Sequence, residues 1–141
     1  MTNPALAFNG VSNKSYNNSA FIAPSINGFG NTVGKNWGTG NDYIINRFTF
    51  VLPNDWAVID GGNFKLEGST NGIVWQDIYV GNTTPVAGMT VDIIQADIGS
   101  TDFPLVAYQY HRLNLQGDGI NAVAVAQLTL YAQNLTFEGD T

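Results

Sequence analysis

The sequence predicts an all-β protein of the sandwich or jelly-roll type, and three observations support this. Short runs rich in β-branched and aromatic residues recur along the chain at even spacing. Sixteen glycines and many asparagines lie between these runs, as turn residues do. Only 11% of the residues are charged, whereas long helices usually contain many Glu, Lys and Arg residues. With 141 residues, the chain is expected to form one domain, residues 1–141, with its own hydrophobic core.

The N-terminal part is predicted to be irregular up to the first strand. Residues 1–40 are rich in Asn, Gly and Ser, which favour turns. The first predicted strand covers residues 43–52, because this run is β-branched and aromatic and is followed by Pro53. Residues 54–62 are then expected to form a loop.

The next segment predicts a β-hairpin. In residues 63–68, Phe and Leu alternate with Lys and Glu, which indicates a strand with one buried face. Asn71 and Gly72 are typical of a hairpin turn, because these residues accept positive φ angles. The return strand is expected over residues 73–80 and contains Trp75.

The C-terminal half is predicted to add three strands and a final extended segment. The strands are rich in Val, Ile, Leu and aromatic residues and cover residues 86–94, 106–115 and 122–131. The extended segment covers residues 134–137 and begins a C-terminal tail, residues 134–141. We expect the following inward-facing side chains to form the core: Phe48, Phe50, Phe64, Leu66, Trp75, Leu113, Leu128 and Leu130.

Charge and composition argue against several classes of function. The formal net charge is −6, so the chain lacks the basic surface that nucleic acids and anionic membranes attract. There is no Cys, and therefore no disulfide or thiolate chemistry. The N-terminal segment does not resemble a signal peptide, and no apolar run is long enough to span a membrane. We therefore expect synthesis in a cytoplasm, with no nucleic-acid partner and no membrane insertion.

Four segments resemble those of discoidin-like (coagulation-factor C-type, galactose-binding-like) domains and occur in the same order. Residues 64–75 resemble a hairpin whose first strand ends in Gly-Ser, turns through Asn-Gly or Asp-Gly and returns with a Trp. Residues 108–113 resemble the aromatic strand of that family, and residues 126–131 resemble its closing strand. Residues 7–10, Ala-Phe-Asn-Gly, resemble its opening Ala-Phe-Asp-Gly. The resemblance implies a jelly-roll β-sandwich and says less about function, because this fold hosts many ligands.

The chain resembles the discoidin-like domains of tailed-phage virion proteins in three respects: it has few charged residues, it is rich in Asn, and its N-terminal segment does not resemble a signal peptide. This resemblance implies a non-catalytic virion protein, such as a decoration, cement, tail or fibre component, made in the host cytoplasm. Its partners would be other virion proteins and copies of itself, with host-surface glycan as a further ligand. The alternative is a lectin-like, carbohydrate-binding adhesion module.

Members of the family often hold a structural calcium ion through an Asp in the opening segment and a Glu in the closing strand. The corresponding residues here are Asn9 and Gln127. Calcium prefers anionic oxygen ligands, and two amides replace two carboxylates. The resemblance therefore implies that this chain holds no metal, and we expect no cofactor.

For His111 and Arg112, a structural role is a simpler interpretation than a catalytic or ligand-binding one. His111 is the only histidine; it is expected to be a surface or interstrand residue, facing away from Tyr110 and Arg112. In the discoidin-like family this arginine is often partly buried beside an aromatic or carboxylate partner, so the resemblance implies a structural ion pair or stacking contact for Arg112 and not a ligand clamp.

The loop carboxylates Asp55, Asp60, Asp97 and Asp102 could be paired as in glycosidases, but solvated carboxylates are the simpler interpretation in an acidic chain. The sequence contains no Gly-x-Ser-x-Gly elbow, phosphate-binding loop or zinc motif, so no catalytic residue is assigned.

Exposed aromatic residues are the best candidates for a binding site, because a sugar ring stacks on them while nearby polar side chains bind its hydroxyls. Trp75 and Trp37 are expected in the core, whereas Trp56 lies in a predicted loop. An exposed aromatic residue could equally anchor a protein interface. The predicted glycan or interface site consists of loop residues: Trp56, Asp55, Asn54, Tyr16 and Phe29.

Overall fold

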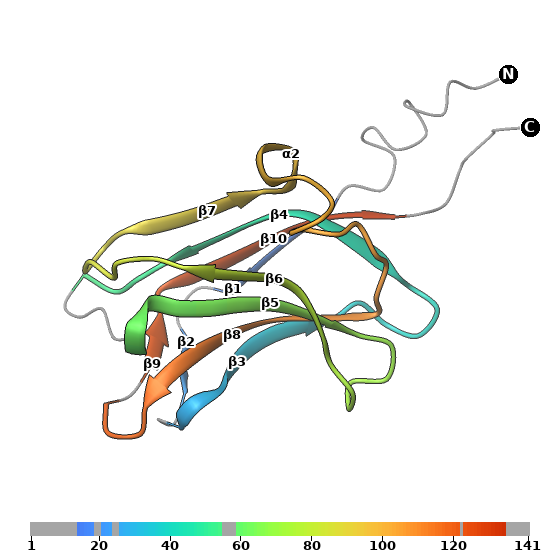
Figure 1. The fold of residues 1–141 in the computed structure, drawn as a ribbon. Helices are drawn as coiled ribbons and strands as arrows, with labels where there is room; N and C mark the ends of the chain where they lie inside the picture. Colours follow the sequence, from blue (N-terminus) through green and yellow to red (C-terminus); the bar gives the residue numbers. More distant parts are fainter. Residues whose placement is uncertain (1–13, 19–20, 24–25, 55–58, 122, 135–141) are drawn as a thin grey trace, which may run out of the picture.

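The computed structural model describes residues 14–18, 21–23, 26–54, 59–121 and 123–134 (Figure 1). Within these ranges the secondary structure is nearly all β. The elements are β1 (Lys14–Asn18), β2 (Phe21–Ala23), β3 (Asn27–Asn36), β4 (Tyr43–Val51), a 3-10 turn η1 (Asp60–Gly62), β5 (Asn63–Ser69), β6 (Gln76–Asn82), β7 (Thr90–Ile94), α2 (Gln95–Ile98), β8 (Tyr110–Asp118), β9 (Val123–Val125) and β10 (Gln127–Asn134).

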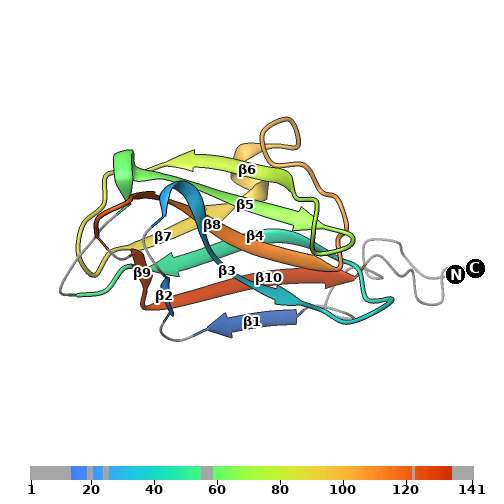
Figure 2. The ribbon, with the colours of Figure 1, turned by 90° about the horizontal axis from the view of Figure 1, so that it is seen from below.

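Two four-stranded antiparallel sheets form the body of the protein (Figures 1 and 2). One sheet has the strand order β1-β10-β4-β7, and the other has the order β3-β8-β5-β6. Strands β2 and β9 form a separate two-stranded pair. The prediction of an all-β jelly-roll sandwich is confirmed. No helix among the described residues is long and apolar enough to cross a membrane.

The core lies between the two sheets and is built by alternation along their central strands. Phe48 and Phe50 of β4 point inward, and Phe64 of β5 meets both rings at centroid distances of 6.3 and 5.0 Å. Seven of the eight predicted core side chains are at most 1% exposed: Phe48, Phe50, Phe64, Leu66, Leu113, Leu128 and Leu130.

Trp75, the eighth, is only half-buried, so its placement in the core was wrong. It precedes β6 instead of lying within it. The guanidinium of Arg112 lies 3.9 Å from the centre of the Trp75 ring, and the Tyr110 ring is 6.3 Å away. Arg112 and Tyr110 alternate with the buried residues of β8 and therefore face outward. Trp75 consequently covers the outer surface of the sheet.

The N-terminal region is more regular than its composition predicts. Strands β1, β2 and β3 all lie before residue 37 and pair with β10, β9 and β8. The buried side chain of Asn31 supports the start of β3, because its Nδ2 donates to the carbonyls of Ile26, Gly28 and Leu115 and its Oδ1 accepts from the Ile26 amide. Long-range pairing thus overrides the weak local strand propensity of Asn and Gly.

Several predicted strand limits also need correction. Strand β7 begins at Thr90 instead of residue 86, and β8 covers Tyr110–Asp118 instead of residues 106–115. The predicted strand 122–131 is two strands, because the chain changes sheets near Ala126: β9 pairs with β2, and β10 pairs with β1 and β4. Of the predicted C-terminal tail, only Asn134 lies within the described residues, at the end of β10.

Candidate functional site

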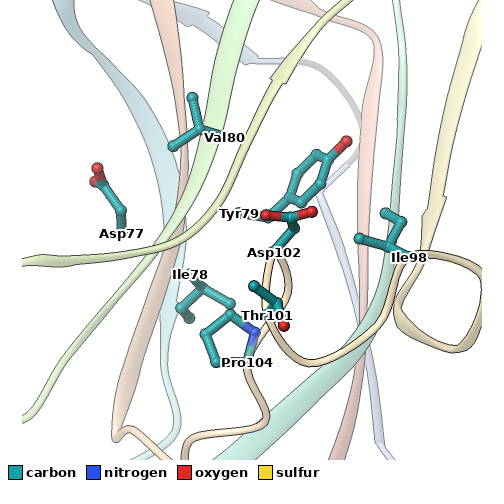
Figure 3. A pocket seen from close by; sticks show the side chains of 8 residues that line it. All are labelled: Asp77, Ile78, Tyr79, Val80, Ile98, Thr101, Asp102 and Pro104. Atoms are coloured by element: carbon teal, nitrogen blue, oxygen red, sulfur yellow. The ribbon is translucent and has the colours of Figure 1, made fainter.

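An open groove lies along β6, which is the last strand of its sheet. Its other wall is the segment that follows α2. The groove has a volume of about 440 Å³, which is within the usual range of small-molecule sites. Figure 3 shows its lining residues: Asp77, Ile78, Tyr79, Val80, Ile98, Thr101, Asp102 and Pro104.

A β-bulge shapes the β6 wall. Glu67 of β5 pairs with Asp77, and Leu66 pairs with Tyr79, which leaves Ile78 as an extra residue on β6. A bulge lets two consecutive side chains turn toward the same side. Ile78 is buried, and the half-buried ring of Tyr79 packs against the same core.

Gly81 makes room for this arrangement. A Cβ atom on Gly81 would lie 2.5 Å from Phe64 Cζ and 2.7 Å from Tyr79 Cε2. Both distances are far below a normal carbon contact, so a side chain here would displace the two rings. Glycine at position 81 therefore helps to fix the orientation of Tyr79 in the groove wall.

The second wall is fixed by a glycine and a phenylalanine. Helix α2 ends at Ile98 and is capped by Gly99, whose φ of 98° is readily adopted by glycine and whose amide donates to the Gln95 carbonyl. The amide of Phe103 donates to the Gly99 carbonyl, and the Phe103 ring is completely buried. That ring lies 5.6 Å from the ring of Tyr79, which joins the two walls of the groove.

The groove carries negative charge on both walls. Asp77 is exposed and forms an ion pair with Lys65, at 3.1 Å between Nζ and Oδ1. Asp102 is exposed on the other wall, and no cation lies within ion-pair distance of it among the described residues. No Lys or Arg is among the residues that line the groove. In Figure 3, Tyr79, Thr101 and Asp102 lie on the side of the groove away from Asp77.

These side chains suit a small ligand that is both apolar and rich in hydroxyl groups. Tyr79, Val80 and Ile98 offer apolar contact, while Thr101 and the two carboxylates can bind donors. Carboxylate oxygens form the stronger, charge-assisted kind of hydrogen bond with hydroxyl groups.

None of the predicted site residues that the structure describes is among the residues that line this groove. Trp56 and Asp55 are outside the described residues. Asn54 is exposed just after β4, where the carbonyl of the preceding Pro53 accepts from the Gly88 amide of the β6–β7 loop. That position belongs to a loop end of the sandwich.

Tyr16 and Phe29 lie in strands β1 and β3, so their assignment to loops was wrong. Strand β1 is at the opposite end of its sheet from β7. Phe29 is half-buried, and Lys65 Nζ lies 4.7 Å from the centre of its ring. Phe29 thus contacts the cation that pairs with the groove residue Asp77, but it does not line the groove.

His111 lies inside the protein and not at its surface. It is completely buried on the core side of β8, opposite in direction to Arg112. Its Nδ1 accepts a hydrogen bond of 2.8 Å from Trp37 Nε1, and its Nε2 has no partner. Burial lowers the pKa of His111 to about 3, so the ring is neutral at neutral pH. It packs edge-on against the rings of Trp37 and Tyr108.

Arg112 has the structural role that the sequence predicted. Its Nε donates to Glu67 Oε1 at 2.6 Å while the guanidinium stacks on Trp75. Glu67 is only 4% exposed and also accepts from Asn114 Nδ2. The expected ion pair and the expected stacking contact are both present.

The sequence did not predict any of the groove residues as a binding site. Of these residues, it singled out only Asp102, as a solvated carboxylate. Its exposure, like that of Asp60 and Asp97, agrees with that interpretation. No local pattern distinguishes Tyr79 from any other strand aromatic, because its role depends on the bulge at Ile78. Among the described residues, no three His, Cys, Asp or Glu side chains lie close enough together to hold a metal ion.

No protein-family model matches the sequence, and no curated protein is significantly similar to it. Solved structures with a similar fold do exist. CBM62 from Clostridium thermocellum Xyl5A has a TM-score of 0.60 and 15% identity, covering 92% of this chain and 83% of that chain. CpGH89CBM32-6 of Clostridium perfringens has a TM-score of 0.54 and 12% identity, covering 87% of this chain and 95% of that chain.

A third structure was solved with a bound sugar. It is CpGH89CBM32-5 from Clostridium perfringens in complex with GalNAc-β-1,3-galactose, with a TM-score of 0.51 and 20% identity. It covers 71% of this chain, and this chain spans 64% of its length. At such identities the similarity shows a common fold. These neighbours are carbohydrate-binding modules, and their fold is the discoidin-like, galactose-binding-like jelly roll.

Proposed function

We propose that this protein is a carbohydrate-binding module that holds a sugar in the groove between β6 and residues 98–104. The observation that carries the proposal is the groove, which combines an aromatic ring, a hydroxyl and two carboxylates on its two walls. The fold supports it, because the similar structures are carbohydrate-binding modules.

The chemistry of each wall suits one part of a sugar. The ring of Tyr79, with Val80 and Ile98 nearby, offers apolar contact to the C–H face of a pyranose. Asp102 and Thr101 are placed to bind hydroxyl groups at its edge. The groove is open, so binding is expected to be weak and to leave the rest of a longer glycan in solvent.

A single substitution in the groove tests this function. Asp102→Ala removes an exposed acceptor and should leave the melting temperature unchanged. It should weaken glycan binding by about tenfold, since hydrogen bonds to charged groups contribute on that scale. Calorimetric titration with a panel of galactose- and glucose-containing oligosaccharides, with and without charged groups, measures this.

Asp42→Ala is the matched control. Asp42 is exposed and does not line the groove, and its removal changes the net charge by the same amount. This variant should bind as the wild type does. Binding by none of the panel, or equal loss in both variants, would contradict a sugar site in this groove.

The virion assignment remains a separate prediction. The three similar structures described above come from bacteria, and none of their names refers to a phage. A host-surface glycan ligand would be compatible with either location. Location in a virion, contacts with other virion proteins and the absence of catalysis are therefore predictions from the sequence that purified particles and activity assays would test.

A further inference from the structure

The two carboxylates of the groove are compensated to different extents. Asp77 has Lys65 at 3.1 Å, whereas Asp102 has no ion-pair partner among the described residues. They belong to opposite walls, β6 and the segment after α2. Figure 3 shows their carboxylate groups pointing to different parts of the groove, so they are not arranged as a pair.

Lys65 is held on the sheet by several contacts. Its Nζ lies 3.1 Å from Asp77, 3.4 Å from Glu67 and 4.7 Å from the centre of the Phe29 ring. Glu67 is nearly buried and is also bound by Arg112 and Asn114. Moving Lys65 toward Asp102 would leave Glu67 and Asp77 without this cation, which is unfavourable for a carboxylate that is 4% exposed.

The negative charge without an ion-pair partner is therefore that of Asp102, which lies with Thr101 on the wall that follows α2. An ion of opposite sign that binds there gains attraction, and an ion of the same sign is repelled. The net charge of −6 adds a weak field of the same sign over the whole molecule.

We propose, resting on the proposed function, that this groove prefers sugars with an ammonium group and disfavours sugars with a carboxylate or sulfate group. Asp102 is the specificity-determining residue. The ammonium of an amino sugar binds its carboxylate while the sugar ring contacts the apolar residues of the groove. Sugars with an N-acetyl group at the same position lack this charge and bind more weakly.

The experiment compares matched sugars that differ in one charge. The probes are β-linked oligomers of glucosamine and galactosamine and the same oligomers in N-acetylated form. Titrations are done at about pH 6, where an amine of ordinary pKa is protonated and a carboxylate is ionised. The wild type should bind the amine forms up to roughly fivefold more tightly at low salt, which is the upper end of the range for an exposed ion pair. Molar salt should reduce this ratio to near one.

Two variants with equal net charge locate the preference. Asp102→Asn keeps the size of the side chain and an acceptor oxygen but removes its charge, and it should abolish the preference for the amine. Asp42→Asn makes the same change outside the groove and should keep the preference. If both variants lose it equally, the preference belongs to the overall charge and the inference is wrong.

The remaining outcomes separate this inference from the proposed function. Equal binding of amine and N-acetyl forms, or binding of a neutral or acidic glycan but no amine form, overturns the charge selection and leaves carbohydrate binding in place. Binding of no glycan at all overturns both.

Discussion

His111 makes the stability of the protein depend on pH through a single buried side chain. The imidazole is completely buried, and burial lowers its pKa to about 3. Among the described residues, the imidazole has one hydrogen bond, accepted from Trp37 at Nδ1, which requires the unprotonated form of that nitrogen. Protonation would place a charge inside the core with no carboxylate among its ring and hydrogen-bond partners.

The sign of the effect follows from the two pKa values. Between about pH 6.5 and pH 3 the unfolded chain carries a proton on His111 and the folded protein does not. The free energy of unfolding is therefore greatest above pH 6.5 and decreases by about 1.4 kcal/mol per pH unit through this window. Urea unfolding at several pH values should show this slope. His111→Gln keeps an acceptor for Trp37 and cannot titrate, so it should lose less stability between pH 6.5 and 4. Equal slopes in both proteins would contradict a neutral buried His111.

Trp75 illustrates at the residue scale why the local sequence did not predict every core residue correctly. The position of its hairpin was correct: Gly72 has a φ of 75°, and Asn71 Oδ1 accepts from the amides of Ile73 and Val74. These bonds lengthen the turn and delay the start of β6 to Gln76. The indole therefore lies outside the strand, on Arg112. An alternating pattern cannot reveal such a delay.

At the scale of the elements, the groove depends on Phe103. Its buried ring lies 5.6 Å from Tyr79 and 6.1 Å from Phe48, and it holds the segment after α2 against β6. We expect Phe103→Ala to lower the free energy of unfolding by about 3–5 kcal/mol, as large-to-small core substitutions do. It should also reduce sugar binding under conditions where the variant is still folded, because one wall loses its anchor.

Phe103→Leu provides the control, since it keeps an apolar side chain of similar size. It should cost less stability and retain most of the sugar binding. Chemical denaturation gives the stabilities, and titration with the best-binding oligosaccharide gives the affinities. A Phe103→Ala variant that binds sugar normally would show that the second wall is not needed.

Among the elements, some could be predicted from the local sequence, and others depend on contacts with distant parts of the chain. Strands β4 and β5 could be predicted from local sequence, because Phe48 and Phe50 in β4, and Phe64 and Leu66 in β5, alternate with less buried residues. The bulge at Ile78 and the sheet change at Ala126 depend on pairing with distant strands, and β1 to β3 depend on pairing with β8, β9 and β10. The groove combines β6 with a segment about twenty residues later in the chain, so its composition follows from the tertiary fold.

At the scale of the whole molecule, several carboxylates are compensated by groups of the protein itself. The described carboxylates Glu67, Asp77 and Asp92 already have Lys or Arg partners. Asp118 accepts from the amides of Ile120 and Asn121, which lowers its pKa. These contacts compensate carboxylates that would otherwise attract metal ions.

Calcium should therefore have no effect on the stability of the folded protein. Gln127 is exposed at the start of β10, and Asn9 lies outside the described residues. Both are amides at positions where the resemblance implied carboxylates, and calcium sites normally need several anionic oxygens. A ligand that binds only the folded state raises the melting temperature, so its removal must lower it. We expect the melting temperature to be the same with millimolar calcium and with excess chelator. A decrease of several degrees on chelation would show that other oxygen atoms of this chain form a calcium site.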